Sequence, residues 1–287
     1  MNTRKLALFA GLFAATLPLA AQNAPGLKTI GISDVKPTPA LVTSVKKAGT
    51  ENSLDRVTQA LDSQLIDRVH NTRKFEVIAR SDLASVLKEN DFTGADFKVK
   101  GVNYILVTAV DDFQDYEESA FFASLNKTVK KRVIRFSAVG KVYDAESGKL
   151  LESTNFQINN RDIDEPLQNS TRSGELSDEL LLDITRKMAD KIANRVVDVI
   201  YPAKIVAKQD KQVTLNRGDG TGIAIGQVWE VFALGEEMID PDTGQSLGRD
   251  EVSVGKVKVV RVLPKTASAE ILEDLGITKN AIVRPVQ

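Results

Sequence analysis

The sequence contains no cysteine and only one histidine among its 287 residues. Without cysteine, no disulfide can stabilise the fold, and no lipid-modified cysteine can anchor the chain as a bacterial lipoprotein. One histidine also leaves only carboxylates for a zinc site, and a Ser-His-Asp triad would depend on His70 alone. His70 falls near the end of an expected helix, where a histidine ordinarily interacts with the helix dipole. We therefore predict no catalytic, cofactor-binding or metal-binding residue, and no cofactor.

A strong net charge is absent as well. Lys and Arg number 38 against 39 Asp and Glu, so the chain is no polycation and nucleic acid is not an expected partner. The glycine-rich stretch 216–222 follows an expected strand without opening a helix. It is therefore interpreted as a turn rather than a phosphate-binding loop.

Long apolar runs are limited to Leu6–Leu19, which is too short to span a bilayer and follows Arg4 and Lys5. This pattern predicts a cleavable signal peptide over residues 1–24 and a periplasmic location, with outer-membrane association left open. The alternative is an uncleaved N-terminal anchor.

The region 25–200 predicts strands and helices in the order β-α-β-α-β, followed by a hairpin and a long helix. Apolar residues recur at three- and four-residue steps in the first helix, at Leu54, Val57, Leu61, Leu65 and Val69. The expected elements are strands Leu27–Val35, Lys74–Ala79 and Tyr104–Val110, the helix Asp82–Glu89 capped by Ser81, the hairpin Arg132–Tyr143 with Lys149–Ile158, and the helix Ser177–Ile200. The stretch through Lys46, Lys47, Gly49 and Thr50 is expected to be a loop.

At Tyr201-Pro202 the spacing of apolar residues changes from helical to the alternation of short β-strands, so this dipeptide is the expected domain boundary. The expected strands are Ala203–Ala207, Gln212–Asn216, Gln227–Phe232, Val254–Val262, Thr266–Glu270 and Ala281–Pro285. Six short strands suggest a small barrel over 201–287. Since the link is short, we expect weak coupling between it and the domain 25–200.

Three runs of the first domain can be compared with a known family: Phe75–Leu87, Gly101–Val107 and the hairpin Val139–Leu151. Together they resemble the curli secretion channel (CsgG) family. The second domain is similar to the C-terminal barrel of a flagellar ring protein (FlgT), through Pro202–Val206, Leu215–Gly218, Gly222–Val231 and Ile239–Gly248. The resemblances imply an α+β or α/β fold: a mixed sheet packed with helices in an anticodon-binding-like three-layer domain, then an all-β SH3-like barrel.

The channel members of that family are lipoproteins that insert β-hairpins into the outer membrane, and this chain departs from them. Such hairpins need strands of about 9 to 11 residues with an apolar outer face. The equivalent region Asp111–Lys131 contains many charges, and Asn159–Glu179 is almost wholly polar. Neither segment is expected to insert.

Two smaller features remain. Asp240–Glu251 spaces carboxylates like a calcium loop, but Gln245 occupies the position that needs glycine, so we interpret it as a hairpin turn with acidic residues. Phe121, Phe122 and Leu125 form an apolar cluster outside any expected strand. They either fold back on the core or form an exposed contact for a partner.

The sequence thus predicts an exported, non-enzymatic envelope protein that acts as a protein-binding scaffold or adaptor in assembling an envelope or surface structure. Its expected partners are envelope proteins, and homo-oligomers are allowed. One alternative is an oligomeric CsgG-type outer-membrane secretion channel. Another is a cell-wall hydrolase using paired carboxylates.

Overall fold

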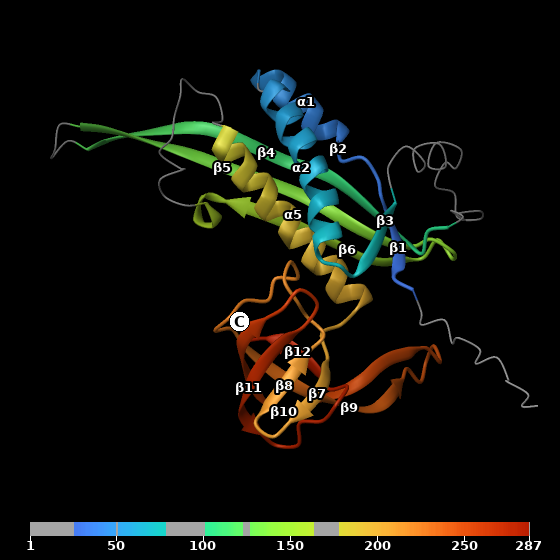
Figure 1. Cartoon of the computed structure of the whole chain (residues 1–287). Helices are drawn as coiled ribbons and strands as arrows, with labels where there is room; N and C mark the ends of the chain where they lie inside the picture. The colour runs from blue at the N-terminus through green and yellow to red at the C-terminus, as the bar shows by residue number, and fades with distance from the viewer. Residues whose placement is uncertain (1–25, 50, 79–100, 123–126, 164–177, 287) are drawn as a thin grey trace, which may run out of the picture.

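The computed structural model describes residues 26–49, 51–78, 101–122, 127–163 and 178–286, which form two β-sheets, three α-helices and one short 3₁₀ helix (Figure 1). Each sheet has its own hydrophobic core. The fold is α+β, with one mixed sheet and one separate antiparallel sheet. The signal-peptide residues 1–24 lie outside the described residues.

The first sheet is mixed, because parallel and antiparallel strands meet at its centre. Its strands are β1 (Lys28–Ile32), β2 (Lys36–Pro37), β3 (Phe75–Ile78), β4 (Tyr104–Phe122), β5 (Lys127–Asp144) and β6 (Leu150–Asn159). They are ordered β3-β1-β4-β5-β6, with β2 also on β4. The pairs β1–β3, β1–β4 and β2–β4 are parallel, whereas β4–β5 and β5–β6 are antiparallel.

Helices α1 (Pro39–Ala48), α2 (Glu51–Asn71) and α5 (Asp178–Ile200) lie together across the first sheet (Figure 1). The predicted stripe of α2 is confirmed, since Leu54, Val57, Leu61, Leu65 and Val69 are all buried in one core. Helix α5 carries an apolar stripe at the same spacing, and it is buried in the same core at Leu180, Ile184, Met188, Ile192 and Val196. His70 is exposed in the last turn of α2, as expected.

The loop expected through Lys46 and Lys47 is wrong, because these residues belong to α1. The Thr38 hydroxyl accepts a hydrogen bond from the Leu41 amide and caps the helix, and Pro39 stands at its start. The predicted helix Asp82–Glu89 and its cap Ser81 lie outside the described residues. No helix in the described part of the chain is long and apolar enough to cross a membrane.

The second sheet is antiparallel throughout. Its strands are β7 (Ile205–Gln209), β8 (Gln212–Leu215), β9 (Val228–Ile239), β10 (Ser246–Val262), β11 (Ala267–Asp274) and β12 (Ile282–Pro285), in the order β12-β9-β10-β11-β8-β7. Backbone hydrogen bonds join its two ends, from the Ile205 amide to Ala281 (3.0 Å) and from the Val283 amide to Ala203 (3.0 Å). The outer strands therefore meet around a core that includes Trp229.

Strands β9 and β10 are longer than the sequence indicated and form a hairpin that extends from the second sheet (Figure 1). The segment Asp240–Glu251 contains the turn of this hairpin. The Asp240 carboxylate accepts hydrogen bonds from the amides of Asp242 and Thr243, which hold the pKa of Asp240 below its usual value. The interpretation of this segment as a hairpin turn is thus confirmed.

The glycine-rich loop 216–222 joins the second sheet to the ends of α2 and α5. The Arg217 side chain is fully buried and donates to the Asp198 carboxylate (2.6 Å) and to the Tyr201 carbonyl (2.7 Å). The Lys74 ammonium donates to the Asn216 carbonyl (2.6 Å). Burial lowers the pKa of Lys74, and the charges of Arg217 and Lys265 lower it further. The junction therefore contains buried polar contacts in addition to the short link from which weak coupling was expected.

Candidate functional site

A β-bulge in β4 determines the position of the candidate site. Val110 pairs with Ala138, but Asp112 rather than Asp111 pairs with Ser137, so β4 carries one extra residue at this point. Val110 and Ala138 are buried against the helices. Asp111 and Asp112 instead line a groove with Ser137.

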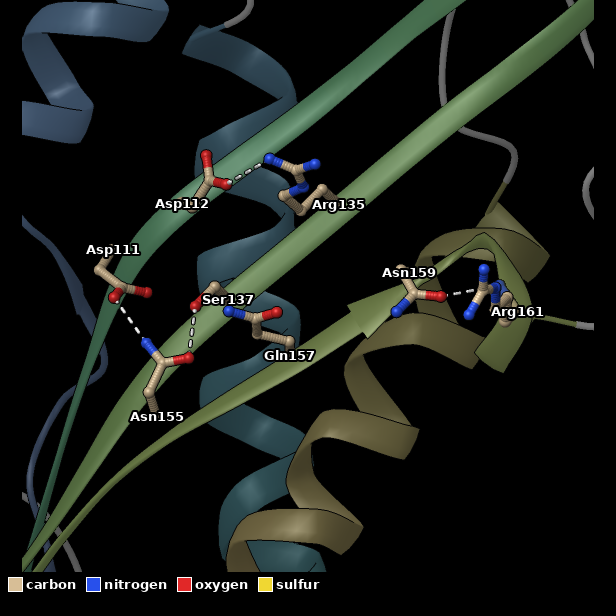
Figure 2. A pocket seen from close by; sticks show the side chains of 8 residues that line it. All are labelled: Asp111, Asp112, Arg135, Ser137, Asn155, Gln157, Asn159 and Arg161. Atoms are coloured by element: carbon tan, nitrogen blue, oxygen red, sulfur yellow. Dashed lines mark hydrogen bonds and ion pairs between the residues drawn. The ribbon is translucent and has the colours of Figure 1, made fainter.

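Strands β5 and β6 supply most of the remaining groove. On β5, Phe136 and Ala138 face the helical core, so Arg135 and Ser137 lie on the opposite face by strand alternation. The groove has a volume of about 490 Å³ and is lined by Asp111, Asp112, Arg135, Ser137, Asn155, Gln157, Asn159 and Arg161 (Figure 2).

Hydrogen bonds fix the first end of the groove. The Asn155 amide donates to Asp111 Oδ2 (2.8 Å), and the buried Ser137 hydroxyl donates to Asn155 Oδ1 (3.2 Å) (Figure 2). Asp111 Oδ1 is buried and has no hydrogen-bond partner in the described structure. One oxygen of Asp111 is therefore buried without a hydrogen bond, on a side chain that Asn155 holds in place.

A loose ion pair occupies the middle of the groove. Arg135 Nη1 lies 4.0 Å from Asp112 Oδ2, and the Gln114 amide donates to Asp112 Oδ1 (3.4 Å). Because Arg135 and Asp112 are both partly exposed, this pair contributes little to stability. It does offset the charge of Asp112 locally.

The other end of the groove is basic. The short 3₁₀ helix η2 (Asn160–Asp162) follows β6 and places Arg161 there, with the Arg161 amide bonded to Asn159 Oδ1 (2.9 Å). Burial raises the pKa of Asp162, but hydrogen bonds from the Asn159 amide and Lys191 outweigh burial and hold this pKa below its usual value. The ionised Asp162 thus secures the turn that positions Arg161. The Arg161 guanidinium has no partner among the described residues.

Beyond the groove, β4 and β5 continue as a two-stranded hairpin (Figure 1). Strand β6 ends its pairing with β5 at Arg135, and β2 ends its pairing with β4 at Val110. Within the described ranges, no third strand pairs with this hairpin from Asp115 to Phe122 or from Lys127 to Ile134. Both outer edges of the hairpin therefore present unpaired backbone groups.

The structure places two of the three predicted contact residues on this hairpin. Phe121 and Phe122 end β4, in register with Thr128 and Lys127. The expectation that they lie outside a strand is wrong, because β4 continues through a segment that the sequence pattern had left irregular. Leu125 lies outside the described residues.

Sequence reasoning missed the groove, because its residues are ordinary polar side chains on separate strands. The one local signal was the Asp111-Asp112 pair directly after a buried apolar run. No group of His, Cys, Asp and Glu suited to a metal ion occurs in the described part of the chain.

Comparison with known proteins leaves the family open. No protein-family model and no curated protein sequence matches the chain. Among solved structures, the hypothetical protein CT253 from Chlamydia trachomatis is 10% identical with a TM-score of 0.38, over 61% of this chain and 98% of that one. The PelC dodecamer from Paraburkholderia phytofirmans is 9% identical with a TM-score of 0.31, over 64% and 90%.

The lipoprotein GNA1162 from Neisseria meningitidis is 13% identical with a TM-score of 0.28, over 58% of this chain and 99% of that one. Because these TM-scores lie below 0.5, the likenesses carry no argument about fold or function. The functional argument therefore depends on this chain's own residues.

Proposed function

We propose that this protein is an exported, non-enzymatic component of the cell envelope that acts as a protein-binding scaffold or adaptor. The observation that carries the proposal is the β4–β5 hairpin, whose edges are unpaired beyond Val110 and Arg135 in the described structure. Unpaired strand edges bind partner segments by adding a strand to the sheet. The N-terminal signal pattern supports export.

The domain resemblances are part of this proposal. We assign 25–200 to a CsgG-like domain, whose described residues form two layers, and 201–287 to a FlgT-like SH3 barrel, and both kinds of module act as scaffolds. The hydrogen bonds that join β12 to the start of β7 support a closed barrel.

The groove supports binding rather than hydrolysis. Hydrolases with paired carboxylates place the two groups on either side of the scissile bond. Asp111 and Asp112 are neighbours on one strand, and no other carboxylate lines the groove. We therefore assign no catalytic residue.

The hairpin also favours a second candidate, an oligomeric outer-membrane secretion channel, because its free strands approach the length of about 9 to 11 residues that crossing a bilayer needs. The sequence of the hairpin opposes this reading. In β4, charged residues occupy both odd-numbered positions (Asp115 and Glu117) and an even-numbered one (Glu118). The paired strand β5 carries Lys130 and Lys131 at successive positions. Dye release from vesicles containing the purified protein would support the channel.

Site-specific photo-crosslinking in the native envelope tests the scaffold function. A photoreactive residue at Ser119 or Thr128, both exposed on the hairpin, should capture one envelope protein in stoichiometric yield. The matched control is the same residue at Glu237, exposed on the β9–β10 hairpin, which should capture little.

A shortened variant checks that capture depends on the hairpin. Replacing Tyr116–Val133 by Asn-Gly closes a two-residue turn across the pair Asp115 and Ile134. This variant should fold and lose its partner, whereas a variant with Glu236–Arg249 replaced by Asn-Gly should keep it. Equal capture by both variants would contradict the proposal.

A further inference from the structure

The groove on the sheet face opposite the helices has opposite charges at its two ends. Asp111 Oδ1 is buried without a hydrogen-bond partner at the β4 end, and the Arg161 guanidinium has none among the described residues at the η2 end. Between them, Arg135 and Asp112 form an ion pair with each other. The unused charges are thus one negative group and one positive group, separated along the groove (Figure 2).

The length of the groove follows from the register of β6. The Asp111 carboxylate accepts a hydrogen bond from Asn155, and Arg161 lies two residues after Asn159, the last residue of β6. The four residue-to-residue steps from Asn155 to Asn159 span about 13 Å, at about 3.3 Å per step. The ammonium and carboxylate of a single amino acid are too close together to reach both ends, whereas those of an extended peptide of about four residues are far enough apart.

The middle of the groove suits the backbone of such a peptide. The side-chain amide of Gln157 has no hydrogen-bond partner among the described residues, and it offers both a donor and an acceptor. The groove contains no aromatic side chain for stacking on a sugar ring and no large apolar side chain. Charge complementarity therefore favours a zwitterionic peptide over a neutral glycan.

We propose that this groove binds a short extended oligopeptide of about four residues, with its free ammonium at Asp111 and its free carboxylate at Arg161. Charge-assisted hydrogen bonds at both ends would set the orientation, and Gln157 would contact the peptide backbone. This inference goes beyond the scaffold function and does not rest on it, because the groove and the hairpin are separate surfaces.

Titration calorimetry of the purified full chain with tetra-alanine tests the inference. Unblocked tetra-alanine should bind, and N-acetylation or C-amidation should each weaken binding at least about tenfold, since each cap removes one charge-assisted hydrogen bond. Free alanine should bind far more weakly than tetra-alanine.

Two variants assign the ends. Asp111→Asn should abolish the difference between free and acetylated peptide but keep the preference for a free carboxylate. Arg161→Gln should do the reverse. Lys141→Gln changes an exposed charge on β5 that does not line the groove, and it should behave as wild type.

Circular dichroism would establish that each variant is folded. Absence of binding to unblocked tetra-alanine would overturn the proposal. Equal affinity for capped and uncapped peptides would also overturn it. A third contrary result would be that no peptide binds, whereas a neutral N-acetylglucosamine oligomer binds and loses its affinity in both Asp111→Asn and Arg161→Gln.

Discussion

The ion pair at the junction of the two sheets predicts that its two partners have unequal effects on stability. Arg217 is fully buried, whereas the Asp198 side chain is 54% exposed. Burial lowers the pKa of Arg217, and the nearby Asp198 carboxylate opposes that shift. The buried guanidinium therefore depends on Asp198, while Asp198 can be hydrated without Arg217.

The magnitudes follow from what each substitution leaves behind. Asp198→Asn leaves a buried cation without its counter-charge, which costs 3 to 5 kcal/mol in fully buried pairs and about 2 kcal/mol here because Asp198 is half in water. Arg217→Met removes the desolvated charge, including two nitrogens that have no hydrogen-bond partner in the described structure, and keeps an apolar side chain in place. It leaves only the Tyr201 carbonyl without its donor, at about 1 kcal/mol.

Urea unfolding separates the two variants. Trp229 is the one tryptophan of the sequence and lies in the core of the second sheet, so its fluorescence reports on that sheet. Far-ultraviolet circular dichroism follows the helices on the first sheet. Asp198→Asn should lower the unfolding free energy from Trp229 fluorescence more than Arg217→Met, and should separate the two transitions further. An equal or larger loss in Arg217→Met would refute the reasoning.

Two further predictions concern single side chains. Gly220→Ala and Gly226→Ala both place alanine at positive φ, which costs about 1 kcal/mol, but a methyl group at Gly220 would also lie 2.6 Å from the Asn71 carbonyl oxygen. Urea unfolding should therefore show Gly220→Ala to be the more destabilising by about 1 to 2 kcal/mol, and equal losses would contradict the close contact. Hydrogen bonds from Lys208 and from the amides of Ile277 and Gly276 together lower the pKa of Asp274 to about 2. This pKa lies below that of an unfolded aspartate, which is about 3.9. The stability that Asp274 confers is therefore complete above about pH 4 and is lost as the pH falls towards 2. Asp274→Asn should thus be less stable than wild type near neutral pH, with a difference that shrinks between about pH 4 and 2 in acid titrations.

The sequence predicted best those elements in which one periodicity runs unbroken. The apolar stripes of α2 and α5 repeat at helical spacing, and both are buried as expected. In β5, Ile134, Phe136, Ala138 and Val142 alternate with residues of the opposite face, and all four are buried. Helix α1 was missed because its two buried residues, Leu41 and Val45, are too few to reveal a period.

Other features depend on contacts that a local pattern does not carry. The outer halves of β9 and β10 lack alternation, since their side chains are exposed on both faces. The burial of Arg217 could not be predicted from the sequence around it. Its partners Asp198 and Tyr201 lie at the C-terminal end of α5, away from the loop that carries Arg217. The candidate groove combines residues of three strands and η2, and its position requires the β4 bulge, which shows only once the register is known.

The bulge also reverses which alternate residues of β4 face the helices. Before it, even-numbered residues such as Leu106 and Val110 face the helices; after it, the odd-numbered Phe113 does. Deleting Asp111 would leave both stretches in phase with β5, whereas deleting Thr108 would turn over one of them. Asp111 is therefore the position at which a related protein could lack one residue of β4. Aligning such a protein with this one without a gap at Asp111 would match residues of the core with residues of the groove.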